Sequence, residues 1–375
     1  MEVSEGRHRI DYLDAVRGLA AMAVVVYHYV LAYGLPSHSR LLTRTPISMA
    51  WNRHSAVSMF FVLSGLVLSI RYFRHAERAD TGGIRYPSFV VSRLCRIGIP
   101  YLAVLFLSAA AWDLSAKHLV TTPPASEWLT VQCWSRPPTL ELLAKESALF
   151  VIGEPRADGR YSLVPQAWSL SVELVVSLLV PAGVAVAIRS TGWLLVAGGL
   201  VATLAGGNVF VFHFALGIAL AKHFHSLAAF AGDNRMRLVI TALAGIGLYS
   251  YNVFLQRIDW LHTEHLDAIA TGIGSAILLV FLAATPTLQR VMTTSPLHHL
   301  GRISFSLYLV HLLVILCITP RILHLLPSLP HPAAWFIGLL ATALVSIVAS
   351  LLLYPSIESP AMAIGRWVSM KLNRP

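Results

Sequence analysis

Long apolar stretches separated by short polar segments run through the chain from one end to the other. About 20 apolar residues suffice to cross the hydrocarbon core of a bilayer as a helix. The pattern predicts ten transmembrane helices, over residues 12–33, 54–73, 92–112, 166–188, 192–207, 208–222, 236–255, 266–284, 303–320 and 334–356. No stretch alternates convincingly as a strand would, so we expect an all-α integral membrane protein, a bundle of about ten transmembrane helices.

The fifth and sixth stretches are the least certain in length, because Gly206 and Gly207 interrupt a longer apolar run where the two meet. Glycine weakens a helix, so a single bent span is the alternative reading of this region. If both stretches cross, the number of crossings is even and the two ends of the chain lie on the same side of the membrane.

One sizeable segment, residues 113–165, lies outside the predicted spans. It contains "TTPPASEW" and "RPPT", and it is too short and too rich in proline to form a convincing separate domain. We therefore expect residues 1–375 to form a single membrane domain with this segment as its outer loop.

Composition supports the membrane assignment, because 56% of the 375 residues are hydrophobic, only 12% are charged and the mean hydropathy is +0.67. The formal net charge is +10, but the basic residues are scattered among apolar spans and form no stripe with aromatic residues, so nucleic-acid binding is not indicated. With the N-terminus in the cytosol, most of the 28 Lys and Arg residues fall on the inner side. This agrees with the positive-inside rule and places both termini in the cytosol.

Metal and disulfide chemistry find little support in the sequence. The three cysteines, Cys95, Cys133 and Cys317, are far apart and form no C-x-x-C pair. The stretch "HTEHLD", His262 to Asp267, lacks the spacing of a metal-binding helix. We predict no metal site.

The first apolar stretch holds an arginine and a histidine eleven positions apart, in "RGLAAMAVVVYH". Eleven residues bring a helix back to within about 20° of its starting direction, so Arg17 and His28 share one face, roughly 16 Å apart. A neutral imidazole at that depth can accept a proton, as a general base must. The structural alternatives are a histidine hydrogen-bonded within the bundle, and an arginine that extends to the interface and pairs with Asp14.

The densest cationic patch surrounds the start of the third predicted span. Arg93 and Arg96 stand at i and i+3 on one face, and Arg71, Arg74 and Arg78 lie on the same inner side. Two guanidinium groups so placed suit the phosphates of a ligand. The alternative is an ordinary positive-inside anchor.

A carboxylate inside a membrane span requires a partner, and Glu173 in "QAWSLSVEL" lies about two turns into the fourth span. It either orients His28 or binds substrate hydroxyls, or it forms a structural pair with an arginine or histidine. Ser64 and Gly65 stand near the middle of the second span, where small residues favour close helix packing.

Further polar candidates lie in the last two spans. "SFSLYLVH" places Ser304, Ser306, Tyr308 and His311 on the ninth, and Glu358 stands at the inner end of the tenth, in "IESP". The serines can instead bond back to carbonyls of their own helix.

Taken together and in this order, these fragments resemble the membrane acyltransferase family 3, whose members transfer acyl groups, usually acetyl, to saccharides, lipids or antibiotics. The matching pieces are "YLDAVRGLAAMAVVVYH", "FFVLSG", the R-x-x-R of Arg93 and Arg96 followed by "IPY", "WSLSVE", "SFSLYLVH" and "IESP". The resemblance spans nearly the whole chain and implies ten helices. Within that family, the chain resembles the stand-alone type, which has no fused extracytoplasmic hydrolase-like domain.

The resemblance and the residue pattern agree on how the chemistry is divided across the membrane. Arg71, Arg93 and Arg96, helped by Arg17, would hold the phosphates of cytosolic acetyl-CoA, the acyl donor. His28 would act as general base on an acceptor hydroxyl.

The remaining candidates complete this picture of the site. Glu173 would orient the base or bind the acceptor, and Arg17, Tyr308 or a serine would stabilise the oxyanion. The expected location is the inner membrane of a bacterial cell. The oligomeric state and the existence of a covalent acyl-enzyme are left open.

The acceptor class follows from the resemblance only in outline. We expect a hydroxyl of a cell-surface or secreted saccharide: an exopolysaccharide, a lipopolysaccharide or a lipochitooligosaccharide. The alternatives are acylation of a small secondary metabolite, a multi-helix exporter of a lipid-linked saccharide, and a catalytically inert relative. Intramembrane Arg, His and Glu also suit a transporter, but the chain shows no paired halves with matching interruptions.

Overall fold

The computed structural model describes residues 5–36, 45–51, 53–77, 86–152, 163–204, 208–251 and 263–372. Within these residues all regular secondary structure is helical and no strand is present. The all-α class predicted from the sequence is confirmed.

Seven helices of the described part are long and apolar enough to cross a membrane: Asp11–Tyr33, Ser55–Phe73, Tyr86–Ala110, Phe210–Gly232, His265–Ala283, Ser304–His324 and His331–Leu372. An eighth candidate is formed by α5 (Ala167–Leu178) and α6 (Val180–Arg189), which pass the same criterion together and meet at an angle of 51°. The chain is a multi-pass membrane protein.

The predicted count of ten spans is not confirmed, and helix length is the reason. α7 (Thr191–Leu204) has 14 residues and α9 (Arg235–Tyr249) has 15. At a rise of about 1.5 Å per residue, each is roughly 22 Å long, against about 30 Å of hydrocarbon. Gly206 and Gly207, on which the bent-span alternative rested, and residues 252–262, which follow α9, lie outside the described residues.

The chain divides into two compact units, each built from separate stretches. The first unit comprises Met1–Ala23, Leu41–Ile84 and Val176–Arg302, and the second comprises Val24–Arg40, Arg85–Val175 and Ile303–Pro375. Two helices, α1 (Glu5–Tyr33) and α5, contribute residues to both units. Assignment of the whole chain to a single membrane domain stays a prediction.

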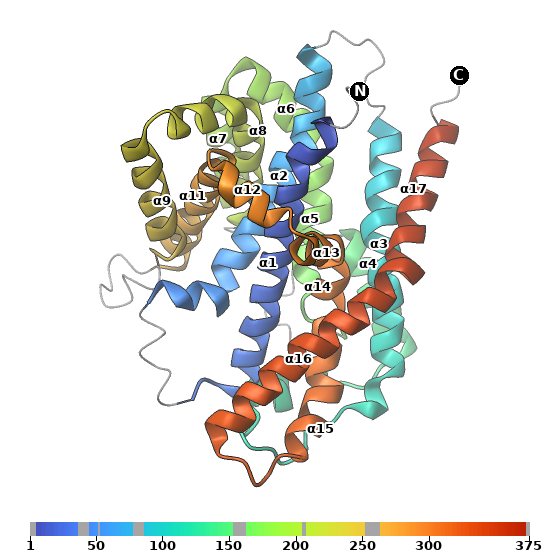
Figure 1. Cartoon of the computed structure of the whole chain (residues 1–375). Helices are drawn as coiled ribbons and strands as arrows, with labels where there is room; N and C mark the ends of the chain where they lie inside the picture. The colour runs from blue at the N-terminus through green and yellow to red at the C-terminus, as the bar shows by residue number, and fades with distance from the viewer. Residues whose placement is uncertain are drawn as a thin grey trace. The chain divides into compact units, whose positions relative to one another are not determined.

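The first unit also contains η2 (Pro46–Trp51), α2 (Arg53–Glu77), α6, α7, α8 (Phe210–Gly232), α9, α11 (Glu264–Ala283), α12 (Pro286–Met292) and α13 (Ser295–Arg302). α2 packs along α8, and α9 lies beside α11 (Figure 1). Glycine permits the first of these contacts: a Cβ atom on Gly217 would lie 2.9 Å from the Cα of Gly65 and 2.8 Å from the nitrogen of Leu66. The close packing expected at Gly65 is therefore present.

The second unit contains α3 (Tyr86–Ala110), η3 (Trp112–Leu114), η4 (Trp128–Gln132), α4 (Leu140–Ile152), α14 (Ser304–Leu313), η5 (Val314–Ile318), α15 (Thr319–His324), α16 (His331–Leu353), η6 (Tyr354–Glu358) and α17 (Ser359–Leu372). α3 runs beside α17, and α14 packs against α16 (Figure 1).

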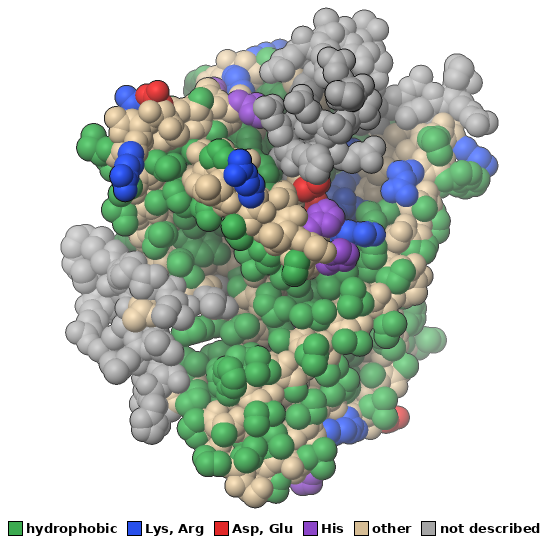
Figure 2. All heavy atoms as spheres, viewed as in Figure 1, with side chains coloured by type: hydrophobic (Ala, Val, Ile, Leu, Met, Phe, Trp, Pro, Cys, Tyr) green, Lys and Arg blue, Asp and Glu red, His purple; other side chains and the backbone are tan. Residues whose placement is uncertain are grey.

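The surface of α16 identifies the face that this unit presents to lipid. A stripe of small residues at a spacing of four is buried, from Ala334 through Gly338 and Thr342 to Ser350. Large apolar residues on the other faces are exposed, among them Leu344 at 63%. Figure 2 shows the corresponding apolar surface over α16. A soluble helix would bury its large side chains instead, so this arrangement fits a helix in a bilayer.

Two wide helical turns interrupt the last spans. η5 and η6 are both π-helical, and each is followed two residues later by a proline, Pro320 and Pro360. A proline lacks the N–H that would bond the carbonyl four residues earlier, and its ring crowds that carbonyl. In the first case the carbonyl of Leu316 accepts the N–H of Ala116 instead. Glu358 is the last residue of the second turn and is buried.

The long segment between α3 and α5 is tied together by buried polar contacts. Lys117, which is 6% exposed, donates to the carbonyl oxygens of Cys133 and Trp134 at 2.6 and 2.9 Å. The indole N–H of Trp134 donates to the carbonyl of Leu163 at 3.0 Å. The described residues of this segment belong to the second unit, and residues 153–162 lie outside the described chain.

Candidate functional site

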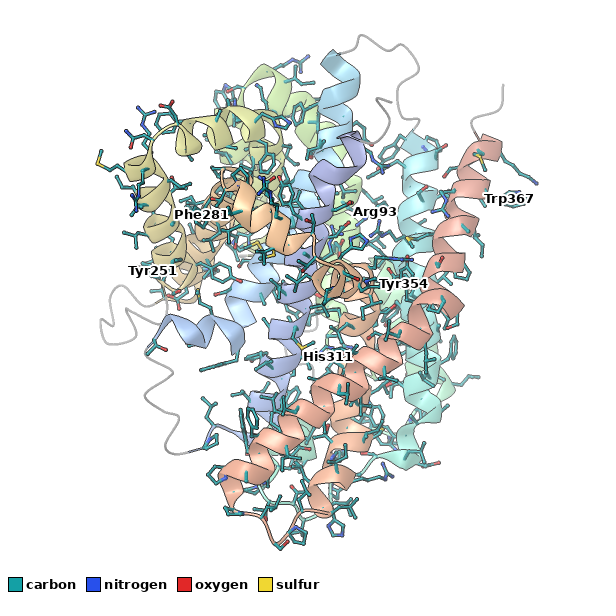
Figure 3. The ribbon with its side chains drawn as sticks, in the orientation of Figure 1. Arg93, Tyr251, Phe281, His311, Tyr354 and Trp367 are labelled. Carbon is teal, nitrogen blue, oxygen red and sulfur yellow. The ribbon has the colours of Figure 1, made fainter. Side chains whose placement is uncertain are left out.

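A pair of histidines from distant parts of the sequence forms the centre of the candidate site. His28 on α1 and His311 on α14 are 283 residues apart, yet Nδ1 of His28 lies 3.1 Å from Nε2 of His311. Their ring centroids are 4.9 Å apart, and His311 is completely buried. Figure 3 labels His311 within the bundle. Both residues were candidates from the sequence, and the structure brings them into contact.

Each ring has a second fixed contact. Nδ1 of His28 also lies 3.0 Å from the carbonyl oxygen of Val24, one turn earlier on α1. Nδ1 of His311 lies 2.8 Å from the carbonyl oxygen of Tyr308 and 3.3 Å from that of Leu307. The orientation of both imidazoles is therefore set by backbone groups of their own helices as well as by each other.

Aromatic rings enclose His28, which is partly buried. Trp128 of η4 lies with its ring centroid 5.8 Å away and tilted by 30°, and Tyr27 meets the imidazole edge-on at 5.0 Å. Trp128 was not singled out from the sequence, because only tertiary packing brings the segment after α3 to α1. These rings limit the water around the imidazole, which strengthens polar interactions there.

Tyr308 connects the histidine pair to α5. Its hydroxyl lies 2.5 Å from the hydroxyl of Ser169 and 3.1 Å from the carbonyl oxygen of Gln166, to which Ser169 also donates. The amide group of Gln166 in turn donates to the carbonyl of Leu309 at 2.8 Å. The hydroxyl protons of Tyr308 and Ser169 thus have acceptors within the protein. The proposed oxyanion role of Tyr308 stays a prediction.

An ion pair between α3 and α5 lies in the same unit. Arg93 donates to the carboxylate of Glu173 at 2.9 Å, and the two side chains are 8% and 26% exposed. The structure thus realises the structural pairing that the sequence offered as an alternative for Glu173. Figure 3 labels Arg93 on α3.

The two arginines of the R-x-x-R motif occupy different environments. Arg93 is buried, whereas Arg96 is exposed and has no hydrogen bond or ion pair among the described residues. Three residues advance a helix by about 300°, so the two side chains diverge by roughly 60°. That offset turns Arg93 toward Glu173 and Arg96 outward, although the sequence predicted a shared face.

Glu358 is a further carboxylate of this unit and is buried, at 2% exposed. Ser306 on α14 donates to it at 2.6 Å. Ser304 is also buried. Ser306 therefore donates to a carboxylate outside its own helix, and not to a carbonyl of α14, which was the alternative drawn from the sequence.

Two sets of polar contacts lie in this unit. Arg93 pairs with Glu173, and Ser169 contacts Tyr308, whose carbonyl oxygen lies beside His311 of the histidine pair. Helix periodicity places several of them: Ser169 and Glu173 follow at i and i+4 on α5, just after Gln166, and Tyr308 and His311 follow at i and i+3 on α14. Chemically, this unit offers an oriented imidazole for proton transfer and, separately, a carboxylate paired with a cation.

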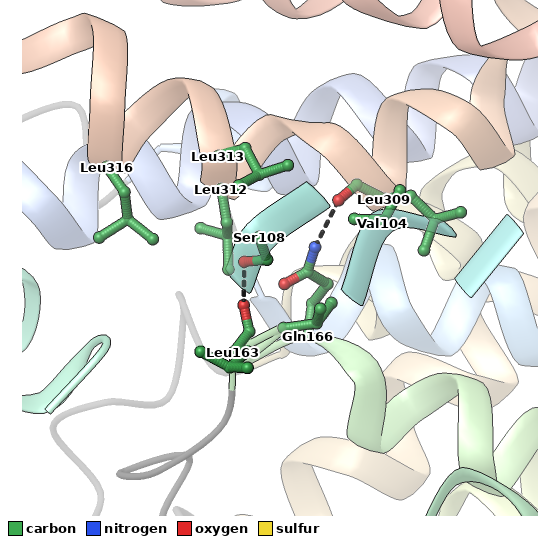
Figure 4. Close-up of a pocket in the computed structure, with 9 residues that line it drawn as sticks. Val104, Ser108, Leu163, Gln166, Leu309, Leu312, Leu313 and Leu316 are labelled. Carbon is green, nitrogen blue, oxygen red and sulfur yellow. Dashed lines mark hydrogen bonds between the residues drawn. The ribbon is translucent and has the colours of Figure 1, made fainter. Parts of the chain in front are cut away.

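A narrow pocket without room for a water molecule lies beside Gln166 and is lined by Val104, Ser108, Leu163, Val164, Gln166, Leu309, Leu312, Leu313 and Leu316 (Figure 4). Ser108 donates to the carbonyl of Leu163 at 2.5 Å. The amide oxygen of Gln166 is buried without a hydrogen bond in the described part of the chain. Leucine and valine side chains form most of the lining, and Ser108 and Gln166 are its polar members.

Other sequence candidates belong to the first unit. Arg17 donates to Asp14 at 3.2 Å, the i, i+3 pair that the sequence suggested as its structural alternative. Ser64 is buried on α2, and Arg71 is exposed near the end of that helix. The side chains of Arg74 and Arg78 lie outside the described residues. The roles of these residues in the site stay predictions.

Metal ligation finds no support among the residues that the structure describes, because no group of three His, Cys, Asp or Glu side chains is arranged to hold an ion. His262, at the start of "HTEHLD", is outside that part of the chain.

Comparison with known proteins gives one match. A family model described as an acyltransferase domain, acyltransferase family 3, matches residues 10–352 of the 375. No curated protein and no solved structure matches the chain. The matched region includes the histidine pair and the ion pair, and it ends before Glu358.

Proposed function

This chain belongs to the acyltransferase family 3, and from that premise we propose that it transfers acetyl from cytosolic acetyl-CoA to a saccharide hydroxyl. That it is a membrane acyltransferase follows from the family and the apolar helices. The observation that carries the more specific proposal is the contact between His28 and His311, because it presents an oriented imidazole inside the bundle.

In the proposed reaction, His28 removes the proton of the acceptor hydroxyl while the hydroxyl oxygen attacks the thioester carbonyl carbon. A new C–O bond forms and a tetrahedral oxyanion results. The C–S bond then breaks, and the proton held by His28 passes to the departing sulfur of CoA. The products are the acetyl ester and free CoA, and His28 returns to its neutral form.

The donor side of this proposal rests on arginines. Arg96 is exposed on α3 and provides a cation for the phosphates of acetyl-CoA, while Arg93 beside it is held by Glu173. We propose that Arg93 contributes to the donor site from this fixed position. Arg71 is kept as a further donor contact, on the grounds of its charge and its expected inner location.

The acceptor side is proposed from the family resemblance. Family members acylate saccharides, lipids or antibiotics, and we rank a cell-surface or secreted saccharide first: an exopolysaccharide, a lipopolysaccharide or a lipochitooligosaccharide. A small secondary metabolite is the second choice. The proposed location is the inner membrane, with both termini cytosolic and His28 in the outer half of the bilayer.

The proposal is tested by mass spectrometry of surface and secreted glycans from a strain that lacks this gene. We expect one glycan to lose an acetyl group, which returns when the wild-type gene is restored but not when the His28→Ala gene is restored. Glycans that are identical in all strains, with a secreted metabolite that loses an acetyl group, would contradict the saccharide assignment.

A further inference from the structure

The contacts of the histidine pair determine where its protons lie. Nδ1 of His311 faces the carbonyl oxygens of Tyr308 and Leu307, and a carbonyl oxygen can only accept a hydrogen bond. Nδ1 of His311 therefore carries a proton. In the neutral ring, Nε2 of His311 then holds the lone pair, and this is the atom that faces His28.

The same reasoning applies to His28. Its Nδ1 faces two acceptors, the carbonyl oxygen of Val24 at 3.0 Å and the lone pair of His311 at 3.1 Å. Nδ1 of His28 therefore donates and carries the proton. The remaining ring nitrogen, Nε2, holds the lone pair of the neutral imidazole.

The opposite arrangement is disfavoured on two grounds. If Nε2 of His311 were the donor, His311 would carry both ring protons and be a cation, although it is completely buried. The lone pair on Nδ1 of His28 would then face the carbonyl oxygen of Val24, so two acceptors would stand 3.0 Å apart. The first arrangement avoids both costs.

We infer that His311 is a positioning residue that holds His28 with its proton on Nδ1, so that Nε2 is the atom that takes the proton of the acceptor hydroxyl. The inference rests on the proposed function. When Nε2 of His28 becomes protonated, Nδ1 keeps its hydrogen bond to His311, which stabilises the imidazolium without a proton leaving the pair. His311 stays neutral throughout.

The position of the protons is tested directly by nitrogen NMR of the purified full chain with ¹⁵N-labelled histidine. Among the 16 histidines, the signals of His28 are those lost in His28→Ala. We expect the unprotonated nitrogen of His28 to be Nε2 in the wild type, and the tautomer protonated on Nδ1 to be less populated in His311→Leu, where only the carbonyl oxygen of Val24 remains to accept from Nδ1. A wild-type spectrum with the proton on Nε2 would overturn the inference. This readout requires no substrate.

The effect on the reaction is tested by acetyl-CoA consumption. His311→Leu removes the acceptor, and we expect kcat to fall about 10²-fold with KM for acetyl-CoA changed less than about twofold. His311→Gln places an amide oxygen near the lost Nε2, and we expect it to recover about tenfold of that loss. Val310→Ala, a buried neighbour on α14, is the matched control for packing and should keep the wild-type kcat.

The two possible failures give different results. If His28→Ala abolishes CoA release but His311→Leu keeps the wild-type kcat, the positioning role is wrong and the proposed function stands. If His28→Ala itself keeps the wild-type rate, the proposed function is wrong, and the positioning role in catalysis falls with it. If Gln and Leu at position 311 are equally impaired, His311 acts through packing rather than through its acceptor, which also overturns the inference.

Discussion

Arg93 on α3 and Glu173 on α5 form an ion pair at 2.9 Å in which the arginine side chain is only 8% exposed. Loss of this pair should cost more than loss of a surface pair, because Arg93 would be left almost desolvated without a partner. The motif arginine that sequence reasoning assigned to phosphate binding is thus also part of the helix packing of its unit.

Breaking this ion pair from one side should be costly. We expect Glu173→Gln to lower the free energy of unfolding by about 3–5 kcal/mol, and the double variant Arg93→Met, Glu173→Leu to lower it by less. Thermal unfolding in detergent measures both. The exposed pair of Arg237 and Asp233, at 3.0 Å and with side chains 42% and 69% exposed, is the control, and Asp233→Asn should cost below about 1 kcal/mol. Equal losses for the two pairs would contradict the buried role.

The exposed arginine of the motif should act on the donor alone. We expect Arg96→Gln to weaken acetyl-CoA binding about tenfold in calorimetry while the unfolding temperature stays at the wild-type value, because its charge meets phosphates rather than a protein partner. Added salt should weaken wild-type binding more than that of the variant. The control is Arg136→Gln, which removes the same charge from the segment between α3 and α5. Donor affinity that is the same in Arg96→Gln and wild type would leave Arg96 as a positive-inside anchor.

The contact of α2 with α8 should tolerate no side chain at Gly217. A Cβ atom there would meet backbone atoms of Gly65 and Leu66 within 3 Å, so Gly217→Ala should destabilise the protein by about 1–3 kcal/mol. Gly199 on α7 has open space around the equivalent position, and Gly199→Ala should be neutral or stabilise by up to about 1 kcal/mol. The two variants should therefore shift the unfolding temperature in opposite directions, and a similar shift in both would show that the helices separate easily.

The topology is tested with single cysteines in a background without Cys95, Cys133 and Cys317. An even number of crossings, eight or ten, places both termini on one side, and the charge distribution places that side in the cytosol. Cysteine at Val120, which is 88% exposed, should react with an impermeant thiol reagent on intact cells, and cysteine at Ala79 only after lysis. Burial raises the pKa of the native Cys133 thiol to about 12, so its own reaction should be slow. Labelling of the Ala79 site from outside would invert the topology.

The fold class could be predicted from the sequence, because the length and hydropathy of each stretch determine whether it can cross a bilayer as a helix. The sequence did not settle the span count, since α7 is apolar but only 14 residues long in the described chain, and α9, with 15 residues, begins with Arg235 and Arg237. Hydropathy records composition, whereas the point at which a helix ends depends on local contacts that a composition window does not see.

The candidate site could likewise be predicted only in part. His28 and Glu173 stood out because ionisable groups are rare within spans, and the R-x-x-R spacing was visible by inspection. The partner of each was not visible, because the contact of His28 with His311 joins residues 283 apart and that of Arg93 with Glu173 joins residues 80 apart. Such contacts follow from tertiary packing rather than from any local pattern.

The measurement that tests the central claim most directly is the release of free CoA from acetyl-CoA by the purified protein in detergent, without an acceptor, followed by chromatography. We expect slow release by the wild-type protein, and release about 10² to 10⁴-fold slower by His28→Ala, with acetyl-CoA affinity and unfolding temperature near wild type. Equal CoA release by wild type and His28→Ala would contradict the assignment of His28 as the base. No release above the rate in buffer by the folded wild-type protein would contradict acetyl-CoA as the donor.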